Sequence, residues 1–185
     1  MIRFLDIAIA GLGLILVSPV LLACCLLVSL TSPGRPIFSQ PRVGKNRRLF
    51  TCYKLRTMRS GTASAATHEV SPSAVTPVGA FLRRTKLDEL PQLWNVVVGD
   101  MSLVGPRPCL PSQAELIGAR DKHGIYALRP GITGPAQVQG VDMSNPERLA
   151  QLDATWLHER SLFTYLMLIV LTVRGRGRGD RVHAA

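Results

Sequence analysis

The sequence predicts a mainly helical α+β domain that is attached to an N-terminal membrane helix. Three observations support this fold class. An uncharged apolar run covers residues 7–30, strand-like residues flank a short turn at residues 43–46, and apolar residues recur at helical spacing over residues 78–98. A chain of 185 residues has room for one such domain and is too short for two independent enzymatic domains.

The apolar run at residues 7–30 is long enough to cross a bilayer, whose hydrocarbon core takes about 20 helical residues. A cleaved signal peptide fits poorly, because the run is too long and no A-x-A-like site follows it. Ser18 and Pro19 lie near its centre, and a proline deletes a helical hydrogen bond, so we expect a kink there. Two geometries are open: a kinked spanning helix, or a re-entrant hairpin with arms of roughly 16 to 18 Å. In either, Ser18 could donate a hydrogen bond to a carbonyl that Pro19 frees.

The segment after the apolar run is strongly basic. Eight basic residues and no acid lie between residues 35 and 59: Arg35, Arg42, Lys45, Arg47, Arg48, Lys54, Arg56 and Arg59. The positive-inside rule therefore places this side of the membrane in the cytoplasm, whichever geometry holds. The formal charge of the whole chain is +10, which favours a polyanionic partner: nucleic acid, anionic headgroups or a phosphorylated substrate.

The four cysteines show no C-x-x-C pair and no spacing suited to zinc, so we interpret them as reduced thiols in a cytosolic domain: Cys24, Cys25, Cys52 and Cys109.

Between residues 34 and 104 the patterns predict five pieces. These are a hairpin over residues 36–58 with a strand at 49–55, a loop at 62–77, a largely helical stretch at 78–98, a turn at 98–100 and an extended piece at 102–104. For the rest of the chain, the residue patterns predict a helix at 111–128, a loop at 129–140 and a final helix at about 145–173. The expected organisation is thus a membrane element at 1–33, a cytosolic domain at 34–173 and a basic Arg/Gly tail at 174–185.

Asp88 and Glu89 form the only adjacent acidic pair in the chain. Neighbours on a helix diverge by about 100°, so with Leu87 and Leu90 facing inward one carboxylate must lie at the edge of the core. Pro91 indicates that a helix starts or breaks nearby. A purely structural interpretation makes Asp88 the N-cap of that helix. It leaves Glu89 unexplained.

Cations surround this pair in the sequence. Arg83 and Arg84 precede it by about one helical turn, and Arg107 lies between two prolines that hold its backbone. A fixed guanidinium binds phosphate in bidentate fashion. Carboxylates beside arginines predict a site where a divalent metal meets a phosphate, and oxygen ligands suit Mg²⁺. Alternatively, one carboxylate attacks phosphorus and forms an aspartyl-phosphate type intermediate.

The segment TPVGAFLRRTKLDELPQLWNVVVGDMSLVGPRP at residues 76–108 resembles the signature of the bacterial sugar transferase family, the monotopic phosphoglycosyl transferases, which start undecaprenyl-linked glycan assembly. Arg3 and Asp6, the pair Ser18-Pro19, and the stretches PIFSQPRVG, YKLRTM and RPGITGPAQVQG match in order, so the resemblance spans nearly the whole chain. It implies a re-entrant helix that enters and leaves on the cytoplasmic face of the bacterial inner membrane.

The resemblance also implies a two-step reaction that needs Mg²⁺. A sugar 1-phosphate leaves its UDP carrier for the enzyme with release of UMP, and then passes to a polyprenyl (undecaprenyl) phosphate, which initiates exopolysaccharide, capsule, O-antigen or glycoprotein glycan synthesis. Asp88 resembles the nucleophile and lies close to the metal, and Glu89 resembles its partner in metal binding. Lys54, Arg83 and Arg107 match positions that hold phosphates, with Pro106, Arg107 and Pro108 near the uridine.

The chain departs from the family pattern at several positions. Pro135, Gln139 and Val141 stand where the family usually has Trp, Asn and Arg; Trp156, Tyr165 and Met167 stand where it has Tyr, Asp and Lys. The change at Tyr165 removes a charge. Asp88 and Glu89 are not among these departures, so the expected reaction class is unchanged. The departures leave the sugar preference and the packing of the C-terminal helices undetermined.

Two other interpretations are a membrane-anchored basic protein that recruits a polyanion and an inactive relative of the family. A nucleic-acid partner is not expected, because the three Arg-Gly repeats of the tail lack aromatic residues. The sequence does not identify the sugar that is transferred. It also leaves the oligomeric state open, and a homodimer is one of the states that it allows.

Overall fold

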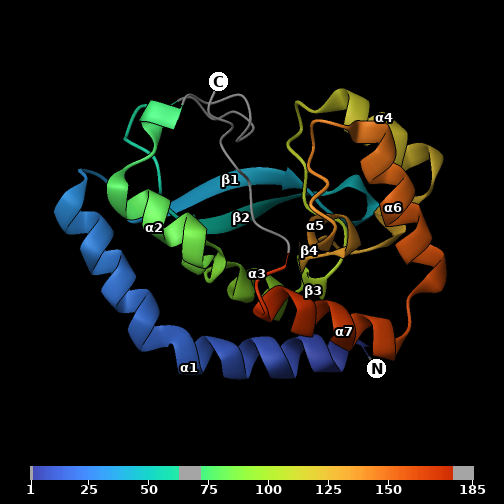
Figure 1. Ribbon diagram of the computed structural model, residues 1–185, viewed down its shortest axis with the longest axis horizontal. Coiled ribbons are helices and arrows are strands. Elements are labelled where there is room, and N and C mark those ends of the chain that lie inside the picture. Colours follow the sequence, from blue (N-terminus) through green and yellow to red (C-terminus); the bar gives the residue numbers. More distant parts are fainter. Residues whose placement is uncertain (1, 63–71, 177–185) are drawn as a thin grey trace.

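The computed structural model describes residues 2–62 and 72–176. Figure 1 shows a long N-terminal helix beneath a small mixed domain. The helices are α1 (Ile2–Thr31), α2 (Pro77–Thr85), α3 (Gln92–Val98), α4 (Ala114–Lys122), α5 (Pro135–Val138), α6 (Pro146–Glu159) and α7 (Leu162–Val173). The strands are β1 (Ile37–Val43), β2 (Leu49–Leu55), β3 (Ser102–Val104) and β4 (Gly131–Thr133). The predicted α+β class, mainly helical with an apolar N-terminal helix, is confirmed.

Helix α1 is continuous through Pro19 and bends near its middle (Figure 1). The Ser18 hydroxyl donates a hydrogen bond of 2.8 Å to the Ile15 carbonyl, which lies four residues before Pro19 and has lost its helical partner. This predicted bond is therefore confirmed. Apolar side chains such as Leu12, Ile15 and Leu22 are exposed along the helix, as expected of a surface that contacts lipid. Both geometries that the sequence leaves open contain this bend.

Strands β1 and β2 form the predicted antiparallel hairpin, with Ile37 opposite Leu55 and Val43 opposite Leu49. A second sheet joins β3 and β4 in parallel, with Ser102 opposite Gly131 and Val104 opposite Thr133. Strand β4 and helix α5 lie in the segment predicted as a loop at residues 129–140. That prediction is wrong because elements of three and four residues are too short to show a period.

The expected helix at residues 78–98 is interrupted. Lys86 adopts a left-handed conformation with φ 59° and ends α2, a 3₁₀ turn η4 (Leu87–Glu89) follows, and α3 begins at Gln92. The interruption turns the Asp88–Glu89 pair away from the axis of α2.

Two other predicted helices are also shorter than expected. Within the helix predicted over residues 111–128, only α4 is an α-helix. Gly124 adopts a left-handed conformation with φ 66°, and a 3₁₀ turn follows it. The predicted final helix at 145–173 is two helices, α6 and α7. Ser161 and Thr164 form a capping box that starts α7 afresh.

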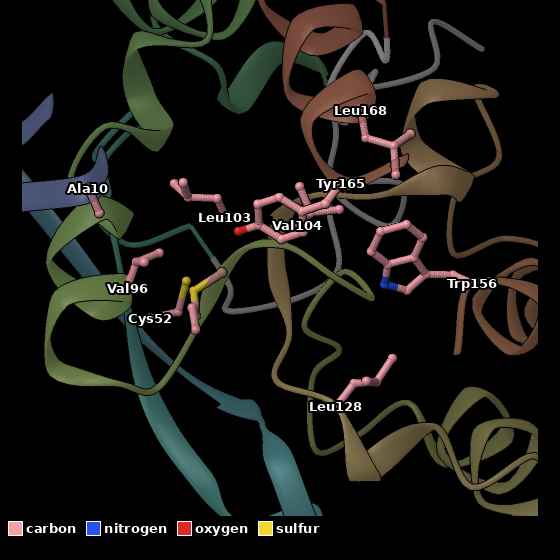
Figure 2. Close-up of a cluster of buried hydrophobic side chains, with 10 residues drawn as sticks. Ala10, Cys52, Val96, Leu103, Val104, Leu128, Trp156, Tyr165 and Leu168 are labelled. Atoms are coloured by element: carbon pink, nitrogen blue, oxygen red, sulfur yellow. The ribbon is translucent and has the colours of Figure 1, made fainter. Parts of the chain in front are cut away.

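The main core lies where α1, β2, α3, β3, α6 and α7 meet (Figure 2). Ala10 from α1 belongs to this cluster together with Val96, Leu103 and Trp156, so α1 contributes to the domain core. All four cysteines are free, as predicted, and Cys52 and Cys109 are buried in hydrophobic clusters. Parts of the predicted loop and tail, residues 63–71 and 177–185, lie outside the described residues.

Tyr165, the departure that removes a charge, is buried at the contact between α1 and α7. Its hydroxyl donates a hydrogen bond to the Asp6 carboxylate, which also accepts from the Ser102 hydroxyl and the Leu103 amide. A phenol at this position supplies a donor to Asp6, whereas a second carboxylate would repel it. The change therefore affects the packing of α7 against α1 and does not reach Asp88.

Gly79 allows α2 to approach the chain that follows β2. A Cβ atom at this position would lie 2.0 Å from the Thr57 carbonyl oxygen, so we expect Gly79→Ala to lower the free energy of unfolding by about 1–3 kcal/mol. Thermal unfolding in detergent measures this. Gly118→Ala in α4 is the matched control, because nothing lies within 4 Å of its Cβ position, and it should be neutral or stabilising by up to about 1 kcal/mol. Equal effects of the two substitutions would contradict the steric explanation.

Candidate active site

Charged residues from four separate elements meet beside η4. Strand β2 carries Lys54, α2 carries Arg83, η4 carries Asp88 and Glu89, and the loop after β3 carries Arg107. The Glu89 Oε1 atom accepts hydrogen bonds from Lys54 Nζ at 3.3 Å and from Arg107 Nη2 at 3.1 Å. All three side chains are largely buried. The structure thus brings together most of the residues that the sequence predicts for the site.

Arg83 stands on the last turn of α2, and its Nε atom donates to the Thr57 hydroxyl at 2.9 Å. It is close enough to Asp88 for its charge to lower the pKa of that carboxyl. Arg84, its neighbour in the sequence, is exposed, so only one of the two arginines belongs to the site.

The N-cap interpretation of Asp88 is wrong. Helix α3 begins at Gln92, Pro91 is its N-cap residue, and no side chain caps it. Pro91 fits there because a proline at a helix start loses no hydrogen bond, which confirms that a helix begins at this point. The position of Asp88 is therefore not explained by capping.

The Asp88 side chain is only 8% exposed, and none of the described residues donates a hydrogen bond to its carboxylate. Burial, with a smaller contribution from the Glu89 charge, raises the pKa of Asp88 to about 6, while Lys54, Arg83 and Arg107 act to lower it. A buried carboxylate without a donor is costly to the fold. Such cost is typical of a group kept for binding or chemistry.

The backbone of Arg107 is held on both sides. Each residue from Gly105 to Cys109 has a backbone group in a hydrogen bond: Gly105 N to Thr133 O, Gly131 N to Pro106 O, Arg120 Nη1 to Arg107 O, Arg42 Nη1 to Pro108 O, and Val43 N to Cys109 O, all between 2.8 and 3.1 Å. The prolines are thus a minor part of the support. The family resemblance implies that Pro106 and Pro108 lie near the uridine of the substrate. Pro106 lines a small hollow with Arg107 and Tyr126, and Pro108 is buried without lining it.

Arg120 and Asp153 support this loop from the interior. Both side chains are almost fully buried, and Asp153 Oδ2 accepts from Arg120 Nε at 2.9 Å and from Nη2 at 2.7 Å. The third guanidinium nitrogen donates to the Arg107 carbonyl at 2.8 Å. Sequence reasoning missed this pair. The available signal was that Asp153 shares a helical face with the apolar residues Leu149 and Ala150.

Lys86 is a third residue that the sequence analysis missed. Its left-handed backbone turns it toward the site, where Glu89 and Arg107 influence its pKa, and burial lowers the pKa of its ammonium group. Its Nζ atom donates to the Arg176 carbonyl at 2.9 Å. A helical Lys86 would have pointed elsewhere, so no pattern in the sequence indicated this contact.

The donor set suits a hard divalent cation that is shared with a substrate. Within residues 2–62 and 72–176 no three His, Cys, Asp or Glu side chains gather as a metal cage. Mg²⁺ is usually held by one or two carboxylates together with water and substrate phosphate oxygens. The Asp88 carboxylate, which accepts no hydrogen bond from a described residue and lies beside Glu89, fits that requirement.

The pKa of Asp88 can be measured directly. In the protein without metal or substrate, we expect its carboxyl carbon to titrate with a midpoint near pH 6, because burial disfavours the charged form. Carbon-13 NMR of aspartate-labelled protein reports the midpoint, and the signal is assigned by its loss in Asp88→Asn. In Glu89→Gln the neighbouring negative charge is gone, so the midpoint should fall. A midpoint near 4 in the parent protein would contradict the effect of burial on the pKa of Asp88.

A membrane-associated domain with a buried acidic pair among fixed cations is typical of proteins that act on phosphorylated substrates. Residues 1–178 match the bacterial sugar transferase family, and the chain belongs to that family. The chain is 39% identical over 184 residues to a UDP-glucose:undecaprenyl-phosphate glucose-1-phosphate transferase of Caulobacter vibrioides, covering 92% of this chain and 67% of the relative. It is 37% identical over 180 residues to the Escherichia coli protein of the same name, covering 91% and 38%.

A third relative is the exopolysaccharide production protein ExoY of Rhizobium meliloti, with 35% identity over 191 residues, 92% of this chain and 83% of the relative. Several relatives are much longer. The chain spans about two fifths of the Escherichia coli protein and of a galactosyl transferase from Streptococcus agalactiae.

Proposed function

We propose that this protein transfers a sugar 1-phosphate from a UDP-sugar to undecaprenyl phosphate or a similar polyprenyl phosphate, and so initiates polysaccharide synthesis. The observation that carries the proposal is the Asp88 carboxylate, buried and without a hydrogen-bond donor among the described residues, next to a Glu89 that Lys54 and Arg107 hold. Family membership and the names of two relatives support the same reaction class.

The reaction proceeds in two displacements at one phosphorus. A carboxylate oxygen of Asp88 attacks the sugar-bearing phosphorus of the UDP-sugar, a new O–P bond forms, and the bond to the bridging oxygen breaks as UMP leaves with the electron pair. A phosphate oxygen of the polyprenyl phosphate then attacks the same phosphorus. The bond to Asp88 breaks, the carboxylate is restored, and the product is a polyprenyl diphosphate sugar.

The remaining site residues provide positioning and charge neutralisation, which dominate phosphoryl transfer. Lys54, Arg83 and Arg107 face the negative charge of the diphosphate, and the braced backbone of Arg107 keeps its guanidinium in place at little entropic cost. A Mg²⁺ ion held by Asp88 and Glu89 would neutralise phosphate charge. At pH 7 a carboxyl with a pKa of about 6 is mostly ionised and ready to attack.

The assay for this function is UMP release by the purified full chain in nanodiscs that contain undecaprenyl phosphate. A panel of UDP-sugars identifies the donor, and a chelator tests the need for Mg²⁺. We expect release with at least one sugar, and an intact-mass increase equal to the phosphosugar when the acceptor is withheld. No release and no adduct with any donor, from protein of unchanged stability, would favour the inactive relative or the basic recruiting protein.

We also propose that α1 is re-entrant and that the domain lies on the cytoplasmic face of the inner membrane. The bend at Pro19 and the basic residues after the apolar run support this topology. An acceptor that stays in the bilayer requires a site at the interface, and a helix that enters and leaves on one face keeps the domain at that height.

Thiol labelling tests the topology. In a background with the four cysteines replaced by serine, either a cysteine inserted directly after Met1 or Pro33→Cys is exposed to a membrane-impermeant reagent. Both positions should react in inverted vesicles and neither in intact spheroplasts. Reaction of the inserted N-terminal cysteine in spheroplasts would show that α1 crosses the membrane.

A further inference from the structure

A cleft of about 510 Å³ opens beside the start of α1, and it shares no lining residue with the cluster around Asp88. Its walls come from the start of α1, the β1–β2 connection, strand β3, the segment before β4, the end of α6 and the start of α7. Apolar side chains form part of the wall, among them Val104, Leu128 and Trp156 (Figure 2).

Four cations line this cleft: Arg3, Lys45, Arg129 and Arg160. The only acid in the wall is Asp6, which is buried and already accepts hydrogen bonds from Tyr165, Ser102 and the Leu103 amide. The cleft therefore carries a strong net positive charge, which attracts an anion.

Two of the cations are held in place. Arg3 Nη2 donates to the Val97 carbonyl at 3.1 Å, and Arg129 Nε donates to the Gly99 carbonyl at 2.8 Å. Both anchors belong to the turn that ends α3. A guanidinium fixed in this way retains further N–H donors for a ligand and loses little entropy on binding it.

The side chains of the other two cations, Lys45 and Arg160, are exposed, and neither side chain has a hydrogen-bond or ion-pair partner among the residues that the structure describes. They are free to close on a ligand from two different elements of the wall, since Lys45 stands on the β1–β2 connection and Arg160 directly follows α6.

The cleft adjoins two helices that expose apolar side chains. Phe4 on α1 and Phe163 on α7 are each 76% exposed, and Figure 1 shows the start of α1 and α7 running side by side along the same edge of the molecule. Amphipathic surfaces of this kind lie at the boundary between headgroups and acyl chains. The positive cleft is therefore at the depth where lipid phosphates are found.

We propose that this cleft binds the phosphate headgroup of an anionic phospholipid of the surrounding membrane. Arg3 and Arg129 provide fixed donors to the phosphate, Lys45 and Arg160 add mobile charge, and the acyl chains lie along the exposed apolar side chains of α1 and α7. This site is separate from the reaction centre, and the proposal does not depend on the proposed function.

Trp156 provides a local signal for binding, because it lines the cleft and the chain has only one other tryptophan, Trp94. In a Trp94→Phe background, the full chain in uncharged maltoside micelles is titrated with dioleoyl phosphatidylglycerol, dioleoyl phosphatidylcholine or glycerol 3-phosphate while Trp156 fluorescence is recorded. We expect phosphatidylglycerol to saturate the signal, with little response to the zwitterionic lipid or to the soluble phosphate.

A pair of double variants with equal net charge separates the cleft from general attraction. Lys45→Ser with Arg160→Ser removes the two mobile cations of the cleft, whereas Arg48→Ser with Arg148→Ser removes two exposed cations, one from the same connection and one from α6, that do not line it. The cleft variant should bind phosphatidylglycerol about tenfold more weakly, and the control should bind like the parent. Equal loss in both variants, or no loss in either, would overturn the proposal. Saturation by glycerol 3-phosphate at the same level would assign the cleft to a soluble anion and overturn the lipid assignment.

Discussion

Replacing Asp88 with asparagine is expected to abolish UMP release and at the same time to stabilise the fold. The activity is lost because the amide is no nucleophile toward phosphorus and does not ligate Mg²⁺ well. The expected decrease is at least about a thousandfold, as for other groups that form the covalent bond. The absence of any phosphosugar adduct by intact mass is the accompanying observation.

The stability change follows from the pKa of Asp88, which burial raises from 3.8 to about 6. Between these values the folded protein binds more protons than the unfolded chain, so the stability of the parent protein falls as pH rises through this window. By pH 7 the ionised carboxylate costs the fold about 2–3 kcal/mol. Asp88→Asn avoids this cost, and its melting temperature should exceed that of the parent at pH 7.

The pH dependence distinguishes this explanation from a general effect of the substitution. Near pH 4 the parent Asp88 is protonated, so the difference in melting temperature between parent and variant should largely disappear. Asp121→Asn is the matched control, since Asp121 is exposed and its ion pair with Arg47 is on the surface; it should keep both activity and stability. An inactive Asp88→Asn that is also less stable at pH 7 would leave loss of structure as the cause.

Replacing Asp153 with alanine is expected to destabilise the protein by about 3–5 kcal/mol, because it leaves the Arg120 guanidinium buried without its counter-charge. Arg120 also donates to the Arg107 carbonyl, so the loop that carries Arg107 should loosen. At a temperature where the variant is still folded, the KM for the UDP-sugar should rise. Thermal unfolding and steady-state kinetics measure the two effects.

Glu147→Ala is the control for that experiment, because Glu147 joins the same two helices through Lys122 in an exposed ion pair at 3.4 Å. Exposed pairs contribute about 1 kcal/mol or less, so this variant should behave like the parent. If Asp153→Ala were no more destabilising than Glu147→Ala, the buried pair would not be the support of the Arg107 loop.

The split of the predicted helices shows where reasoning from periodicity ends. Apolar residues at helical spacing continue past Lys86 and past Arg160, so a window of several turns reports one helix in each case. The breaks are decided by single residues: a left-handed Lys86, and a Ser161 that caps a new helix. These local conformations are selected by packing on the rest of the domain, which periodicity does not report.

The sequence by itself determined the membrane helix with its central bend, the β1–β2 hairpin and most of the charged residues of the site. These features depend on composition and local spacing: a long uncharged run, a proline inside it, a glycine turn between strand-like stretches, and an unusual acidic pair near arginines. Each is determined by interactions over a few residues, so each leaves a pattern in the chain.

The tertiary structure alone decided which charges face one another. It brought Lys54 and Arg107 to Glu89 across 35 and 18 residues of chain, placed Lys86 at the site and excluded Arg84. It also buried Asp88 without a hydrogen bond to its carboxylate from a described residue, joined Arg120 to Asp153, and gathered four cations from distant segments around one cleft. Burial is the main cause of the raised pKa of Asp88, and long-range hydrogen bonds hold the backbone of Arg107. Both depend mainly on contacts between segments that are distant in the sequence.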